Sequence, residues 1–171
     1  VWLALIVLYT RRINKHPLIC FIAPGIGFAV LMVVGTQFVL QGEYTLLPWI
    51  VSIAPFFLIN NLLLLNQYPD IQADASVGRY HLPIAYGVNA SNVTYGVCVL
   101  LATLAIIISA RGAGPRPTAR LALLPMPLAM FSLYGALKHG ESIGGYPQYL
   151  GANVAVTVLV PFLLGLSLVM G

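Results

Sequence analysis

The sequence predicts an all-α membrane protein, a polytopic bundle of transmembrane helices, on three observations. The chain has 171 residues, of which 60% are hydrophobic and only 7% charged, whereas soluble domains carry about 25% charged residues. Its mean hydropathy is +0.93. Apolar runs recur along the chain, and a run of about 18 or more apolar residues is typical of a transmembrane helix. This composition cannot form the polar surface of a water-soluble protein, so we expect membrane lipids to surround the chain.

Five full spans are predicted, and a shorter apolar run opens the chain. The full spans cover approximately residues 18–40, 46–66, 90–110, 120–138 and 149–170. Residues 1–10 are too few to cross a bilayer and are followed by two arginines, so they resemble the end of a sixth helix. The opening has neither an initiator methionine nor the pattern of a signal peptide. We therefore expect residues 1–171 to form a single transmembrane domain that is incomplete at its N-terminus.

Proline, glycine and asparagine occur inside the predicted spans, as at Pro24, Gly25 and Pro55. Membrane helices tolerate such breakers where neighbouring helices satisfy the freed backbone groups, and small residues let helices approach closely. The pattern therefore predicts a tightly packed bundle with bends. Asn60 and Asn61 are expected either to form hydrogen bonds across helices or to lie near a functional site.

The connecting segments carry unequal charge on the two predicted membrane faces. Segments 11–17, 67–89 and 139–148 share one face, which carries Arg11, Arg12, Lys15, Arg79 and Lys138; the other face carries Arg111, Arg116 and Arg120. Cytoplasmic loops carry an excess of lysine and arginine, so we expect the first face to lie in the cytoplasm, with the protein in a bacterial cytoplasmic membrane. The net charge of +4 is too small, and too confined to the connections, to indicate a nucleic-acid partner.

Segment 66–83 concentrates the polar chemistry of the chain. It reads Asn-Gln-Tyr-Pro-Asp-Ile-Gln-Ala-Asp-Ala-Ser-Val-Gly-Arg-Tyr-His-Leu-Pro and holds two of the four acidic residues. Proline disfavours helical angles in the residue before it and suits the first position of a helix, so a short helix is predicted over 69–77, ended by a left-handed cap at Gly78. Asp70 and Asp74 then lie one turn apart on the same face, with Asp70 in the first turn, where the helix dipole favours negative charge.

Two carboxylates this close repel each other unless a cation lies beside them. Oxygen ligands suit Mg²⁺, which takes one or two protein carboxylates and completes its shell with water and phosphate oxygens. We therefore predict that Asp70 and Asp74 bind Mg²⁺ together with a diphosphate, that Arg79 contacts a phosphate oxygen, and that Asn66 orients an aspartate or coordinates the ion. The alternative is that Asp70 and Asp74 lie in a polar, solvated loop at the membrane interface that has no function. His81 is expected in a loop near lipid headgroups or, alternatively, on a phosphate.

Segment 66–83 resembles the second Asp-rich motif of the UbiA family of intramembrane aromatic prenyltransferases, whose pattern is roughly N-E/Q-x-P-D-x-x-x-D-x-x-x-G-K/R-x-T/H-L. The stretch 22–28, followed by Gly35 and Thr36, is similar to a span that precedes this motif in the menaquinone, or 1,4-dihydroxy-2-naphthoate, branch. The resemblance covers about residues 1–110. Because family members have nine helices, it implies that this chain is a C-terminal portion, from the end of the fourth helix through the ninth.

Family members bind Mg²⁺ at two Asp-rich motifs, hold a polyprenyl diphosphate there, and transfer its prenyl group to an aromatic acceptor. The resemblance implies that Asp70 and Asp74 are catalytic metal ligands, that Arg79 and Asn66 bind substrate, and that the context is quinone or related isoprenoid biosynthesis. The first motif, N-D-x-x-D, does not occur in this sequence, so we expect this stretch alone to be inactive. One alternative is a non-catalytic UbiA-like subunit, structural or quinone- and lipid-binding, in a larger complex of membrane subunits. A transporter that couples a cation is another.

Overall fold

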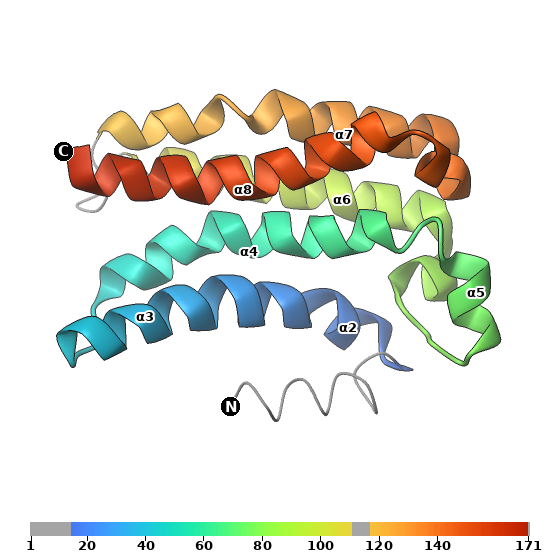
Figure 1. Ribbon diagram of the computed structural model, residues 1–171, viewed down its shortest axis with the longest axis horizontal. Helices are drawn as coiled ribbons and strands as arrows, with labels where there is room; N and C mark the ends of the chain where they lie inside the picture. Colours follow the sequence, from blue (N-terminus) through green and yellow to red (C-terminus); the bar gives the residue numbers. More distant parts are fainter. Residues whose placement is uncertain (1–14, 111–116, 171) are drawn as a thin grey trace.

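The computed structural model describes residues 15–110 and 117–170, and its elements are helical throughout this part of the chain (Figure 1). The first span joins α2 (Pro17–Pro24), the π-helical segment η2 (Gly25–Leu31) and α3 (Met32–Gln41). It is followed by α4 (Leu46–Asn66), the short α5 (Ile71–Ser76), α6 (Leu82–Ser109), the 3₁₀ segment η3 (Pro117–Leu123), α7 (Met126–His139), the 3₁₀ segment η4 (Gly140–Gly145) and α8 (Pro147–Met170).

Within the part of the chain that the structure describes, five helical stretches are long and apolar enough to cross a membrane. They are Pro17–Gln41, Leu46–Asn66, Leu82–Ser109, Thr118–Gly145 and Pro147–Met170. The prediction of an all-α, polytopic bundle with five full spans is therefore confirmed. Large apolar side chains remain exposed on the outer faces, among them Phe28, Val39 and Phe162. Such a surface is what a chain surrounded by lipid requires, and the protein is accordingly an integral membrane protein.

The third span begins well before its predicted bounds of 90–110. Helix α6 begins at Leu82, and its helical backbone is interrupted at Gly87, where φ is 81° and ψ is 168°. Glycine adopts a positive φ readily because it has no Cβ. The stretch after this kink carries the polar residues Asn89, Ser91, Asn92 and Thr94. The predicted start at 90 was therefore too late, because residues 82–89, which include Pro83 and Gly87, belong to the helix and not to the connection before it.

Helix α4 lies at the centre of the bundle. It packs against α2, η2 and α3 on one side and against α6 and α8 on the other, while α7 packs against α6 and α8. Figure 1 shows α4 running between the first span and α8. Its inward side chains, such as Leu58, Leu64 and Leu65, are fully buried. The connections alternate between the two ends of the bundle, so the turn after α4, the start of α2 and the start of α8 lie at the same end (Figure 1).

Asparagine side chains form hydrogen bonds between helices at the centre of the bundle. Asn60 Oδ1 accepts a hydrogen bond from the Gly25 backbone N–H at 2.7 Å, and Asn61 Nδ2 donates to the Tyr95 carbonyl at 3.0 Å. Asn153 Nδ2 donates to the Asn61 carbonyl at 3.2 Å, and the Tyr95 hydroxyl donates to Asn153 Oδ1 at 2.9 Å. The expectation that Asn60 and Asn61 bond across helices is therefore confirmed, with the first span, α4, α6 and α8 all joined.

Candidate functional site

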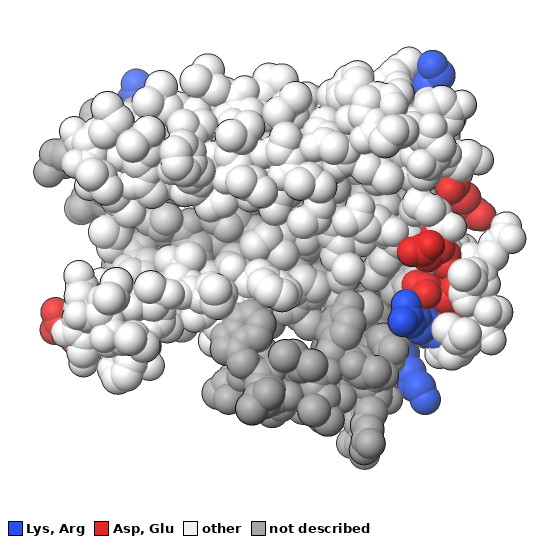
Figure 2. Space-filling model, in the orientation of Figure 1, with Lys and Arg blue, Asp and Glu red and all other residues white. Residues whose placement is uncertain are grey.

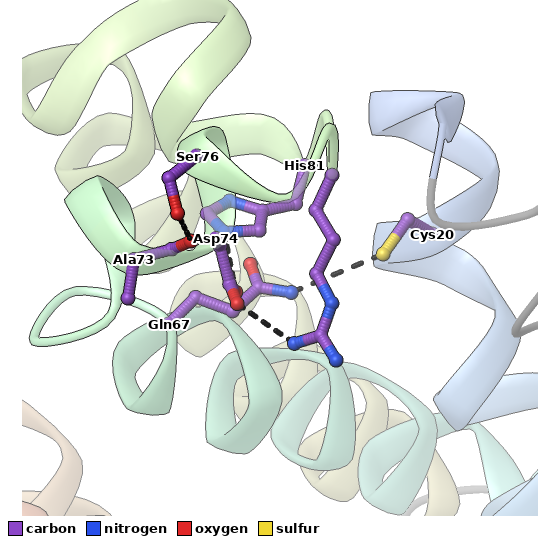
Figure 3. A network of polar contacts seen from close by, with 7 residues as sticks. Cys20, Gln67, Ala73, Asp74, Ser76 and His81 are labelled. Atoms are coloured by element: carbon purple, nitrogen blue, oxygen red, sulfur yellow. Dashed lines mark hydrogen bonds and ion pairs between the residues drawn. The ribbon is translucent and has the colours of Figure 1, made fainter.

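The Asp-rich segment lies at one end of the bundle, beyond the last turn of α4. Figure 1 shows α5 at this end, and Figure 2 shows acidic and basic side chains gathered there, beside a flank that carries almost no charge. Gln72 Nε2, on α5, donates to Glu141 Oε2 on η4 at 3.5 Å. Gln67 Nε2, in the turn before α5, donates to Cys20 Sγ on α2 at 3.9 Å (Figure 3). The segment is therefore attached to elements from the beginning and from the end of the chain.

Helix α5 is shorter than the predicted 69–77. It spans Ile71–Ser76, and Asp70 is its N-cap residue, with φ of −100° and ψ of 3°. Pro69 therefore lies before the helix and belongs to the turn, which is closed in part by the Asp70 N–H. The Asp74 N–H donates to the Asp70 carbonyl at 2.7 Å, so the two aspartates stand one turn apart. The predicted spacing holds, although the predicted start of the helix was wrong.

The end of α5 matches the predicted cap. Gly78 has φ of +76°, its N–H donates to the Ala75 carbonyl at 3.1 Å, and the Arg79 N–H donates to the Asp74 carbonyl at 3.0 Å. This pair of hydrogen bonds, with a glycine in the left-handed region, is the Schellman motif. The reversal carries the chain back past Asp74, and it therefore determines which side chains meet that carboxylate.

The two oxygens of Asp74 have different partners. Arg79 Nη1 lies 2.7 Å from Oδ1, and His81 Nε2 lies 3.1 Å from Oδ2. Figure 3 shows the ring of His81 turned toward Asp74. The Asp74 side chain is 14% exposed. Asp70, by contrast, is exposed, and within the described residues nothing forms a hydrogen bond with its carboxylate. The carboxylate of Asp70 is therefore exposed and without a hydrogen bond to the described residues, whereas that of Asp74 is largely buried and bound to Arg79 and His81.

His81 lies in the connection directly before α6, as expected for a loop residue, but its side chain is buried. The residue is 2% exposed. Burial lowers the pKa of the His81 imidazole, and the hydrogen bond with Asp74 opposes this shift only in part. Nδ1 is buried and has no hydrogen-bond partner in the described part of the chain. A neutral ring that donates from Nε2–H to Asp74 fits both observations, because a proton on Nδ1 would be buried without an acceptor.

Tyr68 and Asn66 precede the two aspartates and differ in their contacts. Tyr68 is fully buried, and its hydroxyl donates to Asn92 Oδ1 on α6 at 2.8 Å. Burial raises the pKa of this phenol, and the contact fixes the end of α4 against α6. Asn66 is exposed at the last residue of α4, and among described residues it forms no hydrogen bond with either aspartate. The structure thus brings together Asp74, Arg79 and His81, but leaves the role of Asn66 a prediction.

The family model described as the UbiA prenyltransferase family matches residues 1–143. The chain belongs to the UbiA prenyltransferase family. The match extends past the segment around the aspartates and covers four of the five spans and the start of η4. Comparison with curated proteins gives no match, and comparison with solved structures gives none either.

The donor atoms of this UbiA-family site suit a magnesium ion that arrives with phosphate. Within residues 15–110 and 117–170 there is no group of three or more His, Cys, Asp or Glu side chains that could hold a metal ion by themselves. Asp70 offers an open carboxylate, and Asp74 shares its oxygens with two hydrogen-bond donors. Mg²⁺ needs only one or two protein carboxylates when phosphate oxygens and water fill the rest of its shell. The residues therefore fit Mg²⁺–diphosphate better than the bare ion.

Proposed function

We propose that this chain contributes the second Asp-rich half of a Mg²⁺-dependent prenyl transfer site. In this proposal a polyprenyl diphosphate is the donor, an aromatic compound is the acceptor, and quinone or related isoprenoid biosynthesis is the setting. Membership of the UbiA family supports the reaction class. The observation that supports the site is the pair of carboxylates, Asp70 and Asp74, one helical turn apart at the end of an apolar bundle, with Arg79 bound to one of them.

Each residue has a role that follows from its position. Asp70 and Asp74 would each offer a carboxylate to the ion. Mg²⁺, when bound, would stabilise the negative charge of the departing diphosphate. Arg79, whose side chain is 53% exposed, would bind a phosphate oxygen through its forked donors. Asn66 would support the substrate from the end of α4. The isoprenoid tail would lie along apolar helix faces, away from the charged end.

We also propose that the Asp-rich end faces the cytoplasm, as in a bacterial cytoplasmic membrane. Lys15, Arg79 and Lys138 lie in or beside connections at this end, whereas Arg120 belongs to η3 near the other end. An excess of basic residues favours the cytoplasmic side. Free Mg²⁺ and phosphorylated metabolites would reach the site from that side.

The test compares carboxylate variants in the complete protein, reconstituted in lipid nanodiscs. Asp70→Asn and Asp74→Asn each keep the side-chain volume but remove the charge, and Glu43→Gln is the control at the opposite end of the bundle. The rate of prenyl transfer is measured by the release of diphosphate. We expect this rate to fall at least about 100-fold for the first two variants and to stay unchanged for the control. Wild-type rates in Asp70→Asn would contradict the proposal. A wild-type protein with no turnover would favour the non-catalytic alternative.

A further inference from the structure

The two partners of Asp74 differ in how firmly they are held. Arg79 follows the helix-ending glycine, and its side chain is 53% exposed. The His81 side chain is only 3% exposed, and Leu82 and Pro83 after it are buried at the start of α6. An exposed arginine retains many rotamers, whereas a buried ring has few. One oxygen of Asp74 is therefore held by a fixed donor and the other by a mobile one.

His81 is not used to stabilise the start of α6. It occupies the N-cap position, but its side chain forms no capping hydrogen bond, and helix N-caps are usually serine, threonine, asparagine or aspartate. Its Nδ1 is also buried without a partner among described residues, and an unsatisfied buried polar atom destabilises the folded state. An apolar residue would avoid that cost in the core. The contact that uses the polarity of this ring is the one between Nε2 and Asp74.

We propose that His81 is a positioning residue, whose Nε2–H holds Asp74 Oδ2 so that Oδ1 is the oxygen exchanged between Arg79 and the cation of a Mg²⁺–diphosphate ligand. The inference rests on the function proposed above and assigns an added residue to the same site. Asp74 is never left without a positive partner in this exchange, because the cation replaces the guanidinium. Arg79 does not lose its anion either, because it moves from a carboxylate to a phosphate oxygen.

The hydrogen bond from His81 matters because Arg79 competes for the same carboxylate. A guanidinium can bind both oxygens of a carboxylate at once through two parallel N–H groups. With His81 in place, Oδ2 faces the imidazole, and the pair with Arg79 has its single contact at Oδ1. Without that donor, Asp74 is free to turn and form a two-point pair with Arg79, which withdraws it from the cation. Hydrogen bonds that orient a metal ligand change metal affinity by about 10- to 100-fold.

The test uses two amide substitutions that differ in the position of their donor. Gln places its amide nitrogen near the position of imidazole Nε2, whereas Asn is one methylene shorter and places it near Nδ1. The complete protein in nanodiscs is titrated with inorganic pyrophosphate at a fixed Mg²⁺ concentration, and binding is measured by isothermal titration calorimetry. We expect His81→Asn to weaken binding by about 10- to 100-fold and His81→Gln to keep most of the wild-type affinity. His16→Leu is the control, since His16 is exposed near the same end.

The outcomes separate this inference from the proposed function. Equal affinities for His81→Gln and His81→Asn overturn the positioning role, whether both match the wild type or both are weakened. If neither variant gives a folded protein by thermal unfolding without ligand, His81 serves the fold, and the inference is likewise overturned. Wild-type affinity in Asp74→Asn would instead remove the proposed function of the site, whatever the His81 variants do.

Discussion

Gly25→Ala tests how the first span is held against the centre of the bundle. A Cβ added at Gly25 would lie 2.6 Å from Asn60 Oδ1 and 2.6 Å from Phe56 Cδ2, where ordinary contact begins at 3.4 Å. The backbone of Gly25 is right-handed helical, with φ of −63° and ψ of −40°, so alanine fits its dihedral angles. The effect of the substitution therefore comes from packing and from the hydrogen bond that Asn60 accepts.

The magnitude follows from three contributions. Overpacking of a well-filled interior costs about 1–3 kcal/mol. Displacement of Asn60 breaks its 2.7 Å hydrogen bond with the Gly25 N–H, and such a bond contributes about 0.5–1.5 kcal/mol. Alanine gains about 0.5–1 kcal/mol over glycine within a helix. Together these predict a loss of about 0.5–4 kcal/mol in the free energy of unfolding.

Equilibrium unfolding in mixed micelles, with increasing SDS and circular dichroism as the signal, measures this loss. Gly35→Ala is the matched control, because Gly35 lies in the same span and an added Cβ there meets no atom within 4 Å. We expect the control to be as stable as the wild type or slightly more stable, by the helix preference of alanine. Equal stability of the two variants would refute the argument, since both have the same propensity gain and differ only in packing.

Three other predictions address the site and the polar centre. Gly78→Ala places alanine at a φ of +76°, which costs about 1–2 kcal/mol; calorimetry should show weaker Mg²⁺–pyrophosphate binding, and SDS unfolding should show a loss no larger than this strain. Tyr95→Phe leaves Asn153 Oδ1 without the Tyr95 hydroxyl, and SDS unfolding should show a loss of about 0.6–2 kcal/mol; no loss would count against the polar centre. Burial lowers the His81 pKa below 6.5, so the neutral imidazole stabilises the fold above about pH 6.5, and this stabilisation is lost as the pH falls. The melting temperature should therefore drop less between pH 7.5 and 5 for His81→Gln than for the wild type, and an equal drop would refute the argument.

Features that depend on a few neighbouring residues could be predicted from the sequence. The spacing of Asp70 and Asp74 follows from one helical turn, and the left-handed cap at Gly78 follows from the lack of a Cβ. The number of full spans follows from the length of the apolar runs, because a bilayer imposes a minimum length. These properties do not require knowledge of which helices pack together, so a single sequence contained enough information.

Features that depend on packing between distant segments could not be predicted. Nothing local to His81 shows that its ring is buried, because burial there depends on how α6 and α5 meet. The same holds for Asp74, whose partners are brought to it by the chain reversal after α5 and the start of α6. A histidine directly before Leu82 and Pro83, at a helix start where serine or threonine would be usual, was the signal in the sequence for another use of this side chain.

The asparagine contacts have a consequence for how the chain assembles in a membrane. Asn61 belongs to the second described span, whereas Asn153, which donates to the Asn61 carbonyl, belongs to α8. Hydrocarbon offers no hydrogen bonds to an inserted polar group, so the Tyr95 hydroxyl of α6 lacks its acceptor, Asn153 Oδ1, until α8 has entered the bilayer beside it. An intermediate that lacks α8 therefore has more unsatisfied polar groups than the finished bundle, and we expect membrane proteases to degrade it faster.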